Sequence, residues 1–138
     1  MPVKALNKNA ILVTVSIALM AVVSAVAGLN VALPAMAVDI QATQTEITWI
    51  VDSYTVVFAG LLLLVGAIGD RYGRKYILAV GLLIFGGAAS FGLLVDTPNA
   101  LIAVRSIMGL GAAAIMPSTL SVISASFEAS EKGKAVGV

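Results

Sequence analysis

The chain has 138 residues, of which 60% are hydrophobic and 11% are charged, and its formal net charge is +1. Ordinary globular domains are about 45–50% apolar and about 25% charged, and a chain this short has too small an interior to hide so much apolar surface. The composition therefore predicts a protein solvated by lipid, with no electrostatic basis for binding nucleic acid. Cysteine and histidine are both absent, which removes disulfides, thiolate chemistry, histidine bases and most zinc sites. No enzyme chemistry, metal or cofactor is indicated.

Four long apolar segments follow one another, at about 10–36, 48–69, 76–95 and 99–126. A membrane-spanning helix needs about 20 mostly apolar residues, and its backbone polar groups must be satisfied within the segment. The sequence thus predicts an all-α polytopic membrane protein. The chain turns apolar again from about 135, which predicts the start of a fifth helix.

The connections between these segments agree with helices. Thr43 and Glu46 have the spacing of a capping box just before the second segment, and Pro98 prevents the third and fourth segments from forming one helix. Basic residues other than Arg105 occur in alternate connections only. They are Lys4, Lys8, Arg71, Arg74, Lys75, Lys132 and Lys134. By the positive-inside rule, the N-terminus, residues 70–75 and the tail are cytoplasmic.

The N-terminus has an alternative interpretation. Residues Ala25 to Ala27 resemble a signal-peptidase site that follows two lysines and an apolar stretch. The apolar stretch continues well past that site, however, so an uncleaved first span is the favoured interpretation.

The stretch GAIGDRYGRK, from Gly66 to Lys75, concentrates charges in an otherwise apolar chain. The positive-inside rule accounts for its three basic residues but not for Asp70. A carboxylate at the C-terminal end of a helix costs on the order of 0.3–1 kcal/mol unless Arg74, Lys75 or the N-terminus of another helix compensates it. Gly73 suits a helix end with a positive φ, and Gly66 and Gly69 permit close helix approach.

This stretch matches the pattern G-x-x-x-D-R-x-G-R-K-x-x-L and resembles the signature loop between helices two and three of the major facilitator superfamily of secondary transporters. Three further segments resemble the corresponding parts of helices one, two and four in the fourteen-helix drug:proton antiporter subfamily. They are residues 29–34, 49–54 and 101–113. The chain departs from that subfamily at Ala25, where a helix-one carboxylate is usual, and at Ala27 and Met108. This departure concerns the charge preference for substrate and part of the proton pathway.

The resemblance implies proton-coupled export of lipophilic or cationic drugs, a multidrug resistance function, across the plasma membrane, most simply the bacterial inner membrane. It implies partnership with the lipid bilayer, protons, small-molecule drugs and the C-terminal helices that a complete transporter has. The energy source is a proton gradient, and no cofactor is needed. A cytoplasmic gate is implied for six residues: Gly66, Asp70, Arg71, Gly73, Arg74 and Lys75.

Two charged residues lie inside the predicted spans. Arg105 is expected to face a cavity or a partner, or else to extend to the outer interface. Asp52 lies at a similar depth, and is either a functional carboxylate or a hydrated one that the helix dipole favours. We expect the two to share one polar cavity. Asn30, Trp49 and Tyr54 complete the candidate residues for substrate contact and proton coupling, although the aromatic pair more simply predicts interfacial anchoring.

Residues 109–114 also match G-x-G-x-x-A, a dinucleotide-binding pattern, but that pattern requires a strand and a soluble βαβ unit. Close helix packing at Gly109 and Ala113 is the better interpretation, with a kink or local loosening at Pro117. Two further alternatives remain for the chain as a whole. It forms a small self-assembling four-helix carrier, or a membrane fragment that packs with a partner without transporting anything.

Overall fold

The computed structural model describes the chain from Lys8 to Ser126, and it confirms the all-α membrane fold. The four helices are α1 (Lys8–Asp39), α2 (Gln44–Tyr72), α3 (Arg74–Gly92) and α4 (Pro98–Ser126). Each is long and apolar enough to cross a bilayer. The fifth helix expected from about 135 lies outside the described residues.

Local chemistry sets the helix ends, which differ from the predicted ones by a few residues. α2 begins at Gln44 because the capping box is formed: Glu46 N donates to Thr43 Oγ1 over 3.3 Å, and Thr43 N donates to the Glu46 carboxylate over 2.8 Å. α3 begins directly after Gly73, whose φ of 105° permits the sharp change of direction. α4 begins at Pro98, where proline's missing N–H has no helical partner to lose.

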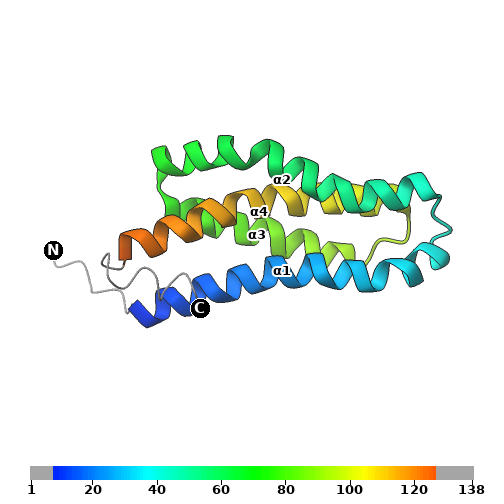
Figure 1. The fold of residues 1–138 in the computed structure, drawn as a ribbon, viewed down its shortest axis with the longest axis horizontal. Coiled ribbons are helices and arrows are strands. Elements are labelled where there is room, and N and C mark those ends of the chain that lie inside the picture. The colour runs from blue at the N-terminus through cyan, green and yellow to red at the C-terminus, as the bar shows by residue number, and fades with distance from the viewer. Residues whose placement is uncertain (1–7, 127–138) are drawn as a thin grey trace.

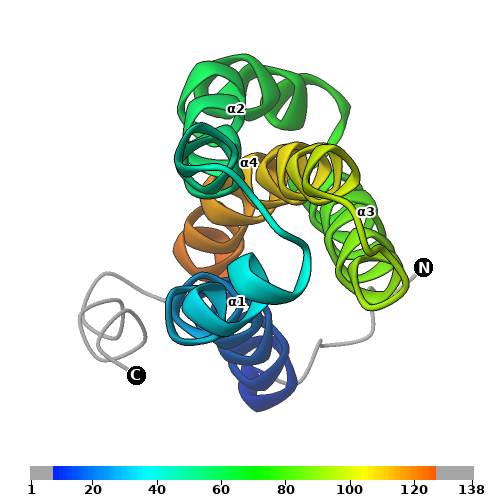
Figure 2. The same cartoon turned by 90° about the vertical axis from the view of Figure 1, so that its right-hand side faces the viewer.

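α4 is the central helix of the bundle. The helices run up and down along the long axis, with the α2–α3 turn at one end and the other two connections at the opposite end (Figure 1). Viewed along that axis, α4 lies between α1, α2 and α3 (Figure 2). Of the most apolar stretch of each helix, 56% is buried in α4 but only 17% in α1. Most of α1 therefore presents its side chains outward.

Small residues bring α3 and α4 into close contact. A Cβ added to Gly81 would lie 2.8 Å from the Cβ of Ala114, and one added to Gly111 would lie 2.8 Å from the backbone nitrogen of Phe85. Neither position has room for a side chain, so the two helices approach at backbone distance. Such small-residue contacts are the usual way in which helices associate where lipid supplies no hydrophobic drive.

Candidate functional site

Arg105 lies on the face of α4 that packs against α2, and only 4% of its surface is exposed. Its Nε donates a hydrogen bond to the backbone carbonyl oxygen of Ile50 over 3.2 Å. Its guanidinium carbon lies 4.5 Å from the centre of the Tyr54 ring, which is the geometry of a cation–π contact. The side chain therefore stays within the bundle and does not extend to the outer interface.

The backbones of α2 and α4 are close beside this arginine. A Cβ added to Gly109 would lie 2.5 Å from the carbonyl oxygen of Tyr54. In the same contact, the hydroxyl of Ser53, the residue before Tyr54, donates to the carbonyl oxygen of Ile102, one turn before Arg105, over 3.4 Å. The structure thus places Gly109 at the α2–α4 contact, and Ala113, one turn further along α4, is fully buried.

Asp52 does not join this arrangement, and here the expected shared cavity is wrong. Asp52 is exposed, whereas the buried face of α2 carries Ile50, Ser53 and Tyr54. No salt bridge links Asp52 to Arg105 in the part of the chain that the structure describes. The reason is helical geometry: residues two apart in a helix point in nearly opposite directions, so Asp52 cannot share the face of Ile50 and Tyr54.

The two aromatic residues expected as interfacial anchors have different surroundings. Trp49 is 53% exposed, as an anchor would be. Tyr54 is buried beneath Arg105 and stacks on Phe58, with the two ring centres 6.1 Å apart, so the anchoring interpretation is wrong for Tyr54. Ile50 and Phe58 are not among the residues predicted for the site. Both lie on the Tyr54 face at helical spacing, which is the signal that would have found them.

Tyr54 and Phe58 also line a cleft of about 370 Å³ between α1, α2 and α4. Asn30 of α1 supplies an amide to this cleft, and the rest of its lining is apolar. An apolar cavity with a few polar groups is the usual form of a small-molecule site. The structure therefore brings Asn30 and Tyr54 together, and leaves Trp49 and Asp52 outside the cleft.

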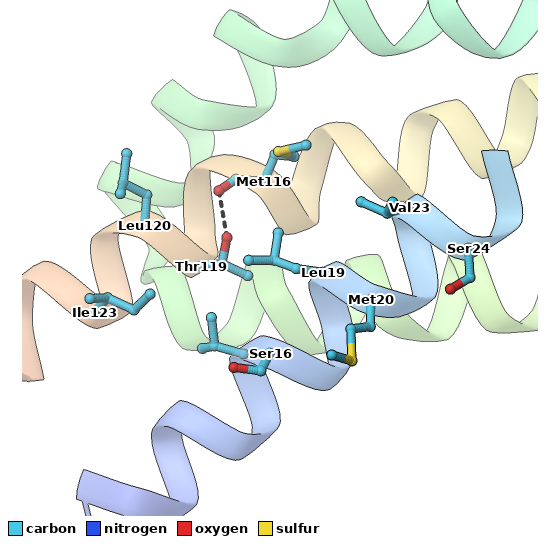
Figure 3. Close-up of a pocket in the computed structure, with 10 residues that line it drawn as sticks. Ser16, Leu19, Met20, Val23, Ser24, Met116, Thr119, Leu120 and Ile123 are labelled. Atoms are coloured by element: carbon cyan, nitrogen blue, oxygen red, sulfur yellow. Dashed lines mark hydrogen bonds between the residues drawn. The ribbon is translucent and has the colours of Figure 1, made fainter. Parts of the chain in front are cut away.

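A second pocket, of about 440 Å³, lies between α1 and α4 towards the other end of the bundle (Figure 3). Its polar groups are the hydroxyls of Ser16, Ser24 and Thr119, and no charged side chain lines it. The Thr119 hydroxyl donates to the carbonyl oxygen of Met116 over 2.7 Å. Val23 and Met116 line both this pocket and the Tyr54 cleft, so the two form one largely apolar track along α1 and α4.

The charged turn between α2 and α3 is held by a local ion pair. Arg74 donates through Nε to Asp70 Oδ1 over 2.8 Å and through a second guanidinium nitrogen to the same oxygen. The Arg74 side chain lies over Gly69, where an added Cβ would be 3.2 Å from its Cδ. Arg74 is thus the compensating partner that the position of Asp70 calls for.

The other predicted gate and packing residues surround this turn. Gly66 faces Pro117 of α4, with 3.8 Å between an added Cβ and the proline Cβ, and a third cavity lined by Asp70 and Arg74 opens beside them. Pro117 lies within α4, which continues past it to Ser126. Arg71 lies over the Tyr72 ring at 5.8 Å, and Lys75 is exposed at a small pocket between α1, α3 and α4.

An all-helical membrane bundle with a buried arginine, a largely apolar track and a charged turn between two spans has the features of a transporter. The sequence profile of the Major Facilitator Superfamily matches residues 15–138, and the chain belongs to that family.

Three relatives are named for resistance to particular compounds. The chain is 42% identical over 110 residues to the puromycin resistance protein pur8 of Streptomyces alboniger. This alignment covers 79% of the chain and 22% of pur8. It is 40% identical to the methyl viologen resistance protein SmvA of Salmonella typhimurium, covering 80% of the chain and 22% of SmvA. It is 42% identical to the methylenomycin A resistance protein of Bacillus subtilis, and this alignment covers 71% of the chain and 21% of that relative. The chain thus spans about a fifth of the length of these curated relatives.

Proposed function

We propose that the chain forms the N-terminal helices of a proton-coupled exporter of lipophilic drugs. Membership of the family and relatives named for resistance to puromycin, methyl viologen and methylenomycin A support export of such compounds. The observation that carries most weight is the buried Arg105 beside an apolar cleft. A charge is retained inside a membrane span, at a cost of about 2.5–3.5 kcal/mol, chiefly where function requires it.

The substrate surface in this proposal is the track along α1 and α4. It offers apolar area, the aromatic pair Tyr54 and Phe58, and a few hydroxyl and amide groups. Such a lining suits lipophilic compounds of varied shape, because it makes few directional demands.

The turn at residues 66–75 acts as a cytoplasmic gate in this proposal, with the N-terminus on the same side of a bacterial inner membrane. The remaining helices of a complete transporter then supply the second half of the cavity. Inward- and outward-facing states alternate as two helix bundles rock about the site between them.

The test is efflux from everted vesicles of cells that express the full-length protein, with puromycin as the probe. Accumulation of puromycin in these vesicles should require a proton gradient and collapse on addition of a protonophore. Arg105→Gln should abolish it at equal protein abundance. Accumulation that survives the protonophore would contradict proton coupling. The absence of puromycin accumulation under any condition would contradict export of this drug.

The two alternatives are separated by the 138-residue chain itself. Reconstituted alone, it should be silent and gain activity only when the C-terminal helices are co-expressed. Activity of the chain alone would favour a self-assembling carrier. Silence in both preparations would favour a membrane fragment that only packs with a partner.

A further inference from the structure

Tyr54 belongs to two structural units at once, and the proposed function does not explain why. Its ring lies beneath the Arg105 guanidinium, and the same residue lines the cleft with Phe58 and Asn30. It is the contact between the buried cation and the cavity in which a drug would bind.

The position of the ring is set by a repeated contact between α2 and α4. Arg105 and Gly109 are one turn apart on α4, and Ile50 and Tyr54 are one turn apart on α2. Arg105 reaches the Ile50 carbonyl oxygen, and Gly109 admits the Tyr54 carbonyl oxygen at a distance that no side chain would permit. The Tyr54 backbone is thereby pressed onto α4, and its ring is directed under the guanidinium.

The electrostatics of the site give this contact its importance. A guanidinium inside a bilayer needs an attractive partner, and no described carboxylate is paired with Arg105. Asp52 lies between Ile50 and Tyr54 in sequence, but it is on the exposed face of α2, opposite the face that carries those two residues. The attraction comes from one backbone carbonyl and the face of one aromatic ring, and a cation–π contact is strongest where water is excluded.

We propose that Tyr54 is the positioning residue for Arg105: its ring holds the guanidinium against α2, next to the cleft that Tyr54 itself lines. The Tyr54 hydroxyl makes no hydrogen bond within residues 8–126, so the ring and not the phenol performs this role. The consequence for transport rests on the proposed role of Arg105, whereas the contact itself does not.

The contact is tested on the 138-residue chain in detergent, labelled with 3-fluorotyrosine. The chain has three tyrosines, at positions 54, 72 and 76, so ¹⁹F spectra give three signals that single Tyr→Phe variants assign. Arg105→Gln should move the Tyr54 signal and leave the other two unchanged. Asp52→Asn is the matched control and should move none of them. Arg105→Lys, which keeps the charge, provides a second comparison if the neutral variant does not fold. A Tyr54 signal that neither arginine substitution moves would overturn the proposal.

The role in transport is tested by rescue in the full-length protein. Tyr54→Leu should reduce the maximal rate of puromycin efflux by about 30-fold, which is the loss of a desolvated cation–π contact converted to a ratio of rates. Tyr54→Phe keeps the ring and should retain most of the rate. Tyr76→Leu, the same replacement at an exposed tyrosine, should behave as the unmodified protein does. A Phe variant as impaired as the Leu variant would show that the ring is not what matters. If the unmodified protein exports nothing, the proposed function fails, and the ¹⁹F result still decides whether Tyr54 holds Arg105.

Discussion

Arg105 is buried and Arg74 is half-buried, and the chain stabilises the two arginines in opposite ways. Arg74 bonds Asp70, a carboxylate four residues earlier, and that carboxylate is 69% exposed. Arg105 has no carboxylate partner among the described residues and relies on a carbonyl and a ring 55 and 51 positions away in sequence. The Asp70–Arg74 pair is thus local in sequence, with its carboxylate open to solvent. The contacts of Arg105 are long-range and enclosed within the bundle.

The difference shows what each arginine reports on. The Asp70–Arg74 pair needs only the turn at Gly73, so it forms wherever α2 and α3 are joined in this way. The Arg105 contacts exist only while α2 and α4 are packed together. Arg105 is therefore sensitive to the helix packing of the bundle, and Arg74 to the conformation of one turn.

The largest expected effect comes from pushing α2 away from α4. Gly109→Ala places a Cβ 2.5 Å from the Tyr54 carbonyl oxygen, a backbone atom that cannot move by itself. We expect a loss of about 1–3 kcal/mol in the free energy of unfolding, as for other overpacked sites, measured by denaturation in mixed micelles. Gly60→Ala is the matched control, because nothing lies within 4 Å of its added Cβ, and it should be neutral or stabilising. Equal losses in both variants would argue against the close contact.

The comparison of the two arginines is tested directly by the same substitution at each. Arg105→Lys removes the planar group that lies over Tyr54 and bonds Ile50, and should cost about 1–2 kcal/mol of stability. Arg74→Lys keeps a cation beside an exposed carboxylate and should cost well under about 1 kcal/mol. Thermal unfolding of the two variants side by side measures the difference. A larger loss of stability for Arg74→Lys than for Arg105→Lys would contradict the conclusion that Arg105 is the more enclosed of the two.

The turn that carries the local pair is tested at Gly73. Its φ of 105° is a conformation that residues with a Cβ rarely adopt, although nothing crowds the position. Gly73→Ala should therefore cost on the order of 1 kcal/mol through backbone strain alone. The same denaturation assay measures this, and an unchanged midpoint would mean that the turn adjusts without strain.

The smallest expected effect on stability is that of Asp70→Asn. An exposed ion pair contributes about 0.2–1 kcal/mol, so the 138-residue chain should unfold almost as before. In the full-length protein, the same change should alter the balance of inward- and outward-facing states. That balance is measured as the alkylation rate of a single cysteine introduced on the proposed cytoplasmic side of a full-length protein from which any other cysteine has been removed. An unaltered rate would remove Asp70 from the proposed gate.

Much of the fold was predictable because its causes are local. The apolar length of each span predicts four helices. The predicted capping box of Thr43 and Glu46 is formed, although α2 begins at Gln44, four residues before the predicted span at about 48. Asp70 and Arg74 are one helical turn apart in sequence, so their pairing was among the possibilities that the sequence leaves open. The site around Arg105 was predicted in part only. The charge of Arg105 is enough to single it out, but depth along the helix puts Asp52 at the same level without specifying which face of α2 it occupies.

The sequence by itself determined the bilayer as solvent, the four spans, the caps and the charged turn, because each depends on composition or on residues within one or two turns. Only the tertiary structure decided what surrounds Arg105. A side chain's partner across two helices depends on how those helices are rotated and how closely they approach. Here the approach depends on Gly109, because the absence of its Cβ lets the Tyr54 backbone come close to α4 and the Tyr54 ring lie under the guanidinium.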